Sequence, residues 1–319
     1  MNSPLPHLQH GSRISHLAGI TPGSSNSLMS GICRISVRQI PRGFTLVEIA
    51  IALFIITLLL GSILVPLTSQ VESRNIDTTQ RILDQARESL LGYAAAYGYF
   101  PCPASATTNG LEAGANHATG ACGATVTGTD TWIGFLPAAT LGFTPVDANG
   151  YALDAWGLSP QNRIRYAVSR STVNGITNPF TKTSGMRSAG MGNIASCVQG
   201  AIAAICTSPS GTSPAGGLLY VCNSGTGVVA ATSCGTAVTL TSNAPVVIWS
   251  VGPNAATTGG TSVHELQNPN PTAGFSNDRI FVSRPMAAAG AAGGEFDDIV
   301  TWIGSPILFN RLIVTGQLP

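Results

Sequence analysis

Residues 42–67 read RGFTLVEIAIALFIITLLLGSILVPL, and this stretch decides the fold because it predicts one long apolar helix. About 20 apolar residues, rising 1.5 Å each, are enough to cross the hydrocarbon core of a bilayer. Glu48 is the one charged residue after Arg42 in this stretch. An acidic side chain costs about 2.5 kcal/mol or more at the centre of a bilayer helix, and less near an interface. The sequence therefore suggests that Glu48 has a dedicated cationic partner.

Residues 43–53, GFTLVEIAIAL, closely resemble the processing site of type IV prepilins and type II secretion pseudopilins. The resemblance implies that a membrane prepilin peptidase cleaves between Gly43 and Phe44 and N-methylates Phe44. It also implies a processing and assembly role for Glu48, and the α-amine freed at Phe44 is the candidate cationic partner. An ordinary membrane anchor or an uncleaved signal sequence is the alternative. The apolar region of a signal peptide is shorter, however, and carries no glutamate.

The distribution of charge predicts how the chain is oriented. Residues 1–43 contain four arginines and no acidic residue, whereas residues 44–319 carry 14 acidic and 11 basic side chains, a net charge of −3. Basic residues beside a first membrane span remain in the cytoplasm. We therefore expect a basic leader at 1–43, a single pass through the inner membrane, and a head in the periplasm that later joins a periplasmic or extracellular filament. Met29 offers an alternative start that would leave a short basic leader.

The helix is expected to cover residues 44–98, with 44–67 in the membrane and the remainder amphipathic. Beyond Pro66, which loosens the helix locally, apolar side chains recur at spacings of three and four residues. They are Leu83, Ala86, Leu90, Ala94 and Tyr97, and this period predicts one buried helix face. Gly98 ends the helix, and Pro101 and Pro103 prevent it from resuming.

Residues 99–319 are expected to form a β-rich globular head, which makes the fold class α+β and pilin-like, with mainly antiparallel strands. Gly, Pro, Ser, Thr and Asn recur throughout, so loops are frequent. The strand-like runs are 164–168, 218–222, 228–231, 237–241, 246–251 and 279–282. Residues 132–137 are typical of a buried connector, and 307–314 fit either a final helical turn or a strand.

Cysteine usage fits an exported head. Of seven cysteines, Cys33 lies in the leader, and the other six are Cys102, Cys122, Cys197, Cys206, Cys222 and Cys234. An even number in an exported domain suggests disulfides, with 15 pairings available to six cysteines. Pairing of sequence neighbours (102–122, 197–206, 222–234) closes the shortest loops and is the expected arrangement. Zinc is disfavoured because no C-x-x-C spacing occurs.

Two further segments are similar to head elements of pseudopilins. Residues 154–157, DAWG, followed by 162–166, NRIRY, resemble an Asp-x-Trp-Gly … Tyr element, and 248–254 with 297–302 resemble a second, paired element. In major pseudopilins that second pair brackets a calcium-binding loop, so the resemblance implies a calcium site at Asp297 and Asp298. Carboxylates and loop carbonyls do suit a hard cation. The alternative is that Asp297 and Asp298 cap a turn while Trp302 packs in the core; no other cofactor is expected.

Catalytic groups are scarce, and the chain is not expected to be an enzyme. After the leader only His117 and His264 remain as histidines, both in polar stretches typical of surface positions, and no nucleophile-elbow, zinc-protease, P-loop or dinucleotide motif occurs. Five basic residues form a loose group predicted to be a solvated face: Arg163, Arg165, Arg170, Lys182 and Arg187. Basic residues are otherwise sparse in the head, so no nucleic-acid partner is expected.

Together these features predict a structural subunit, a pseudopilin or minor pilin of a type IV pilus or type II secretion filament. Its expected partners are the prepilin peptidase, other pilin or pseudopilin subunits, the inner-membrane assembly platform and membrane lipid. The alternative is a binding module at a filament tip, whose large head binds a surface, a glycan or DNA.

Overall fold

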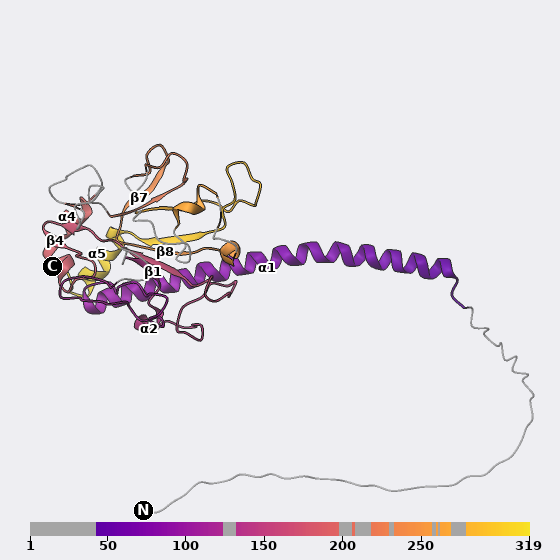
Figure 1. The fold of residues 1–319 in the computed structure, drawn as a ribbon, viewed down its shortest axis with the longest axis horizontal. Coiled ribbons are helices and arrows are strands. Elements are labelled where there is room, and N and C mark those ends of the chain that lie inside the picture. The colour runs from indigo at the N-terminus through magenta and orange to yellow at the C-terminus, as the bar shows by residue number, and fades with distance from the viewer. Residues whose placement is uncertain are drawn as a thin grey trace, which may run out of the picture. The chain divides into compact units, whose positions relative to one another are not determined.

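A computed structural model of the chain shows a mixed α+β protein with one long helix at its start (Figure 1). The structure describes residues 43–123, 132–197, 206–207, 218–229, 233–256, 260, 262–268 and 279–319, with the side chains of 62–68 excepted. Contacts within the chain define two compact units, residues 1–58 and 59–319. The second half of the long helix therefore belongs to the same unit as the head.

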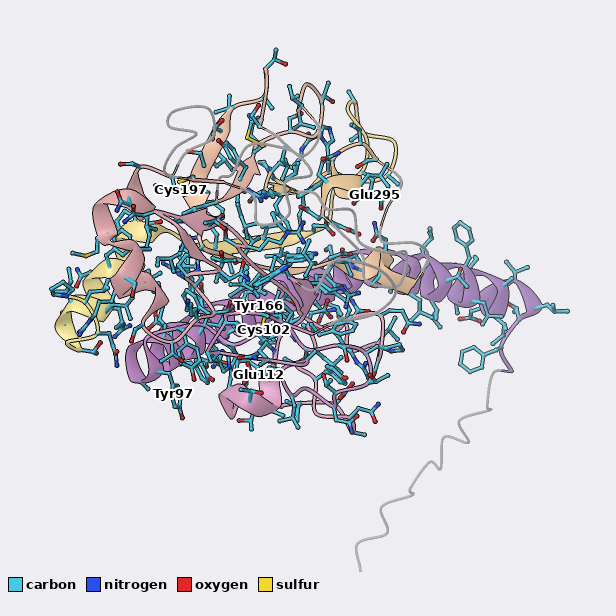
Figure 2. All side chains as sticks on the ribbon, turned by 60° about the vertical axis from the view of Figure 1, so that its left-hand side comes forward. Tyr97, Cys102, Glu112, Tyr166, Cys197 and Glu295 are labelled. Atoms are coloured by element: carbon cyan, nitrogen blue, oxygen red, sulfur yellow. A yellow bond between two sulfur atoms is a disulfide. The ribbon has the colours of Figure 1, made fainter. Side chains whose placement is uncertain are left out.

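Helix α1 covers Leu46–Tyr97, 52 residues, and continues through Pro66. This confirms the prediction of a single long helix. Its second half packs into the head through the predicted stripe, because Leu83, Ala86, Leu90 and Ala94 are buried. The last predicted member, Tyr97, is instead 56% exposed (Figure 2), and that part of the prediction was wrong.

The end of α1 explains why the stripe stops before Tyr97. Gly98 follows with a φ of 78°, a left-handed conformation that glycine adopts without strain, and its N–H donates to Ala94 O at 2.7 Å. The chain then turns, so that the buried Phe100, rather than Tyr97, continues the core. Gln317 Nε2 also donates to the carbonyls of Ala95 and Ala96, both at 3.2 Å, which satisfies two acceptors at the helix end.

The central sheet has four antiparallel strands in the order β1-β2-β8-β10. They are β1 (Ile133–Phe135), β2 (Arg165–Val168), β8 (Val246–Ser250) and β10 (Ile299–Ile303). In the register, Ile248 of β8 lies between Tyr166 of β2 on one side and Thr301 of β10 on the other. Successive side chains of a strand point to opposite faces, and both faces of this sheet are covered.

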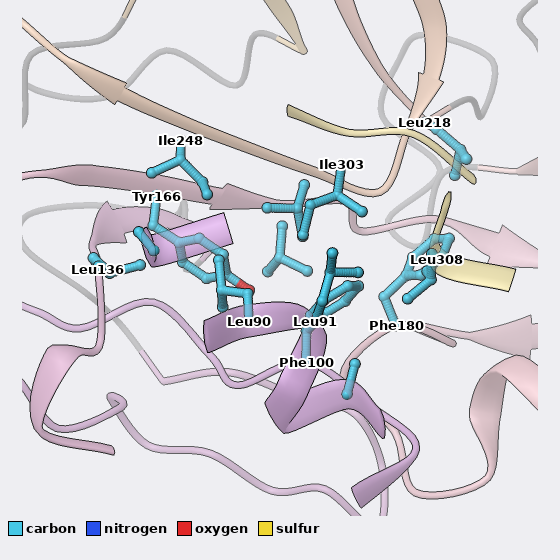
Figure 3. Close-up of a cluster of buried hydrophobic side chains, with 14 of the residues drawn as sticks. Leu90, Leu91, Phe100, Leu136, Tyr166, Phe180, Leu218, Ile248, Ile303 and Leu308 are labelled. Carbon is cyan, nitrogen blue, oxygen red and sulfur yellow. The ribbon is translucent and has the colours of Figure 1, made fainter. Parts of the chain in front are cut away.

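The first face packs against α1. Tyr166, Ile248 and Ile303 belong to the same buried cluster as Leu90 and Leu91 of the helix (Figure 3). Burying a side chain of this size stabilises a protein by roughly 1.5–3 kcal/mol relative to leaving it exposed. The buried helix stripe and the alternating strand residues therefore form one core, which holds the second half of α1 on the sheet.

The second face packs against a smaller sheet with strand order β7-β6-β9. These strands are β7 (Thr239–Ala244), β6 (Leu219–Cys222) and β9 (Ile280–Val282). Val247 and Trp249 of β8 share a buried cluster with Leu219, Val221 and Phe281 of this sheet. Figure 1 shows β7 on the side of β8 away from α1. The pairing of β6 with β9 is parallel, in a head whose other strand pairs are antiparallel within the described residues.

The remaining elements are short. A third sheet joins β4 (Ile176–Thr177), β3 (Thr172–Val173) and β5 (Cys206–Thr207). The other helices are α2 (Ala138–Leu141), α3 (Gly185–Ala189), α4 (Met191–Ala195) and α5 (Ser305–Val314), with 3₁₀ turns at Pro253–Ala256 and Glu265–Gln267. Of the two alternatives for 307–314, the helix is therefore the observed one.

The strand predictions were largely confirmed, with shifts at the ends. The runs at 164–168, 218–222, 237–241, 246–251 and 279–282 correspond to β2, β6, β7, β8 and β9. The run 228–231 falls partly outside the described residues, and Val229 makes an isolated bridge to Ser233. The supposed connector at 132–137 contains β1, whose three residues are too few to show an alternating pattern.

Three disulfides tie the loops of the head together. They join Cys102 to Cys122, Cys197 to Cys206 and Cys222 to Cys234, with Cα atoms 5.5–5.6 Å apart. These are the pairs expected from the shortest loops. The first lies beside the core, because the hydroxyl of the buried Tyr166 donates to Pro101 O at 2.9 Å, next to Cys102 (Figure 2).

Candidate functional site

The start of α1 is organised by Thr45 and Glu48. Thr45 Oγ1 accepts a hydrogen bond from the Glu48 backbone N–H at 3.2 Å, which makes Thr45 the N-cap of the helix. The spacing Thr-x-x-Glu is that of a capping box, and a carboxylate in the first turn is favoured by the helix dipole. This local role was not predicted, although the four-residue pattern was present in the sequence to reveal it.

The two residues before the cap are open to solvent. Phe44 is 75% exposed. A Cβ atom added to Gly43 would meet no other heavy atom within 4 Å. The peptide bond between them therefore lies in an accessible, non-helical segment directly before a capped helix, which is a conformation that a peptidase can bind without unfolding the chain.

The first part of α1 presents apolar side chains all round. Every large apolar residue from Leu46 to Leu60 is at least 46% exposed, including the four consecutive positions 53–56. An exposed apolar surface of this extent marks a site of association with protein or lipid. A helix that is apolar on all sides is stable only when it is buried by such a partner.

Within the part of the chain that the structure describes, no helix is both long enough and apolar enough to cross a membrane. The membrane-spanning half predicted at 44–67 is thus not shown.

In the head, Asp154 joins the two pseudopilin-like elements of the sequence. Its Oδ1 accepts the backbone N–H groups of Trp156 and Gly157 at 3.0 and 3.3 Å. Its Oδ2 accepts from Ser250 Oγ at 2.6 Å and from Asn162 Nδ2 at 2.8 Å. Burial raises the pKa of Asp154, although these four donors oppose the change. The side chain therefore holds the 154–157 turn against the end of β8.

A second group of buried carboxylates forms around Asp297 and Glu265. Glu265 Oε1 accepts the Asp297 backbone N–H at 3.1 Å and Asn254 Nδ2 at 3.3 Å, while Asp297 Oδ2 accepts the Asn254 backbone N–H at 3.3 Å. Burial and the neighbouring Glu265 raise the pKa of Asp297 to about 8. Gly252, with a φ of 67°, passes close by, since a Cβ atom there would lie 2.6 Å from Asp297 O.

Asp298 has different partners from Asp297. Its Oδ2 accepts from Asn268 Nδ2 at 2.8 Å, and Asn268 in turn bonds the N–H and carbonyl of Val282 in β9. Burial raises the pKa of Asp298 well above its usual value. Two adjacent carboxylates therefore engage separate elements, and among the described residues no group of three or more His, Cys, Asp or Glu side chains is placed to hold a metal ion.

The comparison with known proteins gives one result. Residues 40–64 match the family model described as the prokaryotic N-terminal methylation motif. The chain carries the signature of type IV prepilins and pseudopilins. No curated protein and no solved structure matches the chain. The prepilin motif thus coincides with the Gly43–Phe44 junction, the capped start of α1 and its exposed apolar surface.

In this prepilin-like chain, the prediction of a solvated basic face was wrong for Arg163 and Arg165. Arg165 is fully buried; its guanidinium donates to the carbonyls of Arg163 and Gln161 at 2.6 and 2.7 Å and lies 4.9 Å from the centroid of the Phe135 ring. Burial lowers the pKa of Arg165 to about 9, opposed by Asp154 and Asp298. Arg163 is paired with Asp147 at 3.0 Å. Both arginines are therefore buried and bonded inside the head instead of lying on a solvated face.

The prediction of surface histidines was also wrong for His264. It is buried, and its Nδ1 accepts the Gly225 backbone N–H at 2.9 Å. His117 is partly buried: its Nδ1 lies 2.8 Å from Thr181 O and its Nε2 lies 3.1 Å from Glu112 Oε2. In the part of the head described, each histidine thus holds two chain segments together.

The raised pKa of Asp297 predicts a pH-dependent effect of Asp297→Asn. The folded chain retains a proton that the unfolded chain releases above about pH 4, so the native protein loses stability as the pH rises from about 4 to 8. Asparagine has no carboxyl group to ionise, so the variant does not lose this stability as the pH rises. Its amide still accepts and donates hydrogen bonds. We expect Asp297→Asn to be more stable than the native chain at pH 8 by on the order of 1–2 kcal/mol, or about 2–8 °C in Tm, with a smaller difference at pH 5.

Thermal unfolding followed by circular dichroism at both pH values measures this, with the exposed Asp77→Asn as the matched control. An equal Tm difference at pH 5 and pH 8 would contradict the retention of a proton by Asp297. Repeating the scans with added calcium tests the hypothesis of a calcium site at Asp297 and Asp298, which stays a prediction. A calcium-dependent rise in Tm that Asp297→Asn abolishes would support it.

Proposed function

We propose that the chain is a structural subunit, a pseudopilin or minor pilin, that polymerises through α1 into a type IV pilus or type II secretion filament. The observation that carries this proposal is the first part of α1, which presents exposed apolar side chains on every side and lies within the matched prepilin motif, residues 40–64. Such a helix needs a partner along its whole circumference. A bilayer supplies that partner before assembly, and a bundle of identical or related helices supplies it afterwards.

Processing is the first proposed step. Prepilin peptidase would cleave between Gly43 and Phe44, remove residues 1–43, and methylate the amine of Phe44. The open, non-helical conformation of this junction supports access by the peptidase. Since Thr45 caps α1, the helix would keep its start when the leader is removed.

Membrane anchoring is the second proposed step. Residues 44–67 would lie in the inner membrane as a single pass, because Glu48 is their one charged side chain and their length suits the hydrocarbon core. The four arginines of the leader would remain in the cytoplasm and place the head in the periplasm. The inner-membrane assembly platform would then extract the subunit from lipid into a periplasmic or extracellular filament.

Assembly would join Glu48 to the Phe44 amine of a neighbouring subunit. Glu48 makes no ion pair among the described residues of its own chain, and its exposed position in the first turn leaves the carboxylate accessible to a second chain. Opposite charges in an apolar bundle must meet closely, since an unpaired one costs several kcal/mol. The pair would thus select one axial register among the many that apolar packing alone permits.

Mass spectrometry of the native protein tests the proposal. The expected product begins at Phe44 and carries one N-terminal methyl group, an addition of about 14 Da over the unmethylated sequence. The chain expressed without a prepilin peptidase serves as the control and should retain residues before Phe44. A mature chain that begins at any other residue in cells with the peptidase would contradict the proposed processing.

A further inference from the structure

A pocket of about 610 Å³ lies at one edge of the β7-β6-β9 sheet, far along the chain from the prepilin motif. Its walls are formed by residues from three segments: Asn223, Ser224, Leu240, Ser283, Arg284 and Pro285. Ligand pockets in proteins usually have volumes of about 300–1,000 Å³ and combine apolar walls with a few convergent polar groups. This pocket has that size and that composition.

The parallel pairing of β6 with β9 creates the pocket. Cys222 and Val282 are register partners at the ends of the two strands, so the segments that come after them emerge at the same edge of the sheet. Parallel strands commonly place ligand sites at their carboxyl ends for this reason. A hydrogen bond from Ser283 N to Cys222 O, 2.9 Å long, holds the two segments together.

The walls are fixed by contacts outside the pocket. Asn223 Oδ1 accepts the Val238 N–H at 3.0 Å, which holds the start of β7, and hence Leu240, beside the loop. His264 Nδ1 accepts the Gly225 N–H at 2.9 Å and so holds the segment that follows Ser224. The disulfide from Cys222 to Cys234 ties down the same loop. The pocket is therefore largely formed before any ligand arrives, which reduces the entropy lost on binding.

Arg284 gives the pocket its electrostatic character. It is the one formally charged residue in the lining and is partly buried. Among the described residues, no hydrogen bond or ion pair engages its guanidinium. A guanidinium binds carboxylate in a bidentate manner. Ser224, Ser283 and Asn223 add hydroxyl and amide groups around it, while Leu240 and Pro285 provide apolar surface.

We propose that this pocket binds an acidic saccharide, a sugar ring that bears a carboxylate. The carboxylate pairs with Arg284, the ring hydroxyls exchange hydrogen bonds with the serine and asparagine side chains, and the C–H face of the ring packs on Leu240 and Pro285. A small inorganic anion satisfies Arg284 but leaves the apolar wall uncovered, and a neutral sugar leaves the cation unpaired. The inference concerns the head alone and does not depend on polymerisation.

Binding to the full chain in detergent micelles tests the proposal, with glucuronate as the probe. Saturation-transfer NMR and titration are expected to show saturable binding of glucuronate, at least about tenfold tighter than that of glucose, acetate or inorganic phosphate, because none of these fills both the charged and the apolar parts of the pocket. Equal binding of phosphate or acetate would reduce the site to a general anion patch and overturn the saccharide assignment. Absence of saturable glucuronate binding would overturn it as well.

Substitutions locate the binding in the pocket. Arg284→Ala should weaken glucuronate binding about tenfold or more, because it removes a hydrogen-bonded charge partner of the carboxylate. Arg284→Lys keeps the charge but loses the planar guanidinium. Its affinity for glucuronate should therefore lie between those of the native chain and Arg284→Ala. Arg81→Ala removes the same charge from an exposed position on α1 and should leave the affinity unchanged. Unchanged binding by Arg284→Ala, or equal loss in Arg81→Ala, would place the ligand elsewhere.

Discussion

Glu48→Ala is expected to yield a chain that is still cleaved after Gly43 but is largely excluded from filaments. The proposed pair of Glu48 with the Phe44 amine of a neighbour lies in an apolar bundle. Removing one member of a buried ion pair costs about 3–5 kcal/mol because the other charge is left unpaired. That energy corresponds to an incorporation defect on the order of 100-fold or more.

The structure separates this effect from damage to the helix. The N-cap bond of α1 joins Thr45 Oγ1 to the Glu48 backbone N–H, so it survives when the carboxylate is removed. The Glu48 side chain is exposed in the single chain, and its loss leaves no cavity. The defect of Glu48→Ala should therefore appear in assembly and not in the thermal stability of the subunit.

Sheared filament fractions and membrane fractions, quantified by immunoblotting, measure the distribution of the variant. Glu72→Ala is the matched control, because it removes the same charge from an exposed position farther along α1. Glu48→Gln tests whether a hydrogen bond alone suffices, and it should assemble better than Glu48→Ala but less well than the native chain. Normal incorporation of Glu48→Ala would refute the intersubunit pair.

Gly43→Val is expected to abolish processing, so that the chain stays in the membrane with its leader attached. A peptidase that recognises a glycine before the cut has little room for a branched side chain. The chain itself tolerates the change, because a Cβ atom at Gly43 would meet nothing within 4 Å. A loss of cleavage would thus reflect the peptidase site and not the fold. Gly43→Ala should show the same defect more mildly.

Gly61→Val provides the matched control for this experiment. A Cβ atom added to Gly61 would likewise meet no heavy atom within 4 Å, but this glycine lies inside α1, away from the junction. The ratio of precursor to mature chain on a gel reports the outcome for both variants. Cleavage of Gly43→Val at the native rate would show that the proposed peptidase site is misplaced.

Local periodicity explains why the helix and its buried face could be predicted. The spacing of Leu83, Ala86, Leu90 and Ala94 is a property of consecutive residues, and the buried positions matched it. The prediction failed at Tyr97, where the chain turns at Gly98 and the neighbouring Phe100 takes the core position. The last turn of a helix depends on the direction in which the chain leaves it, and periodicity carries no information on that direction.

The burial of charged residues in the head, by contrast, could not be predicted from the local sequence. The sequence predicted a solvated face for Arg165, because charged side chains are rarely buried, and either a calcium site or a turn cap for Asp298. Arg165 donates to carbonyls only two and four residues away, but Asp298, which favours its charged form, lies far along the chain. Asp298 in turn bonds Asn268, 30 residues away. Pairs of this kind leave no local pattern, so only the folded chain reveals them.

By itself, the sequence determined the prepilin motif, the long helix and the division of that helix into an apolar and an amphipathic half, since all three depend on neighbouring residues. The tertiary structure alone decided the parallel pairing of β6 with β9, the network around Asp297 and Glu265, and the pocket at Arg284. The physical reason is that hydrogen bonding between strands is made by the backbone, whose donor and acceptor are common to every residue except proline. Which strands pair is selected by packing of the whole core.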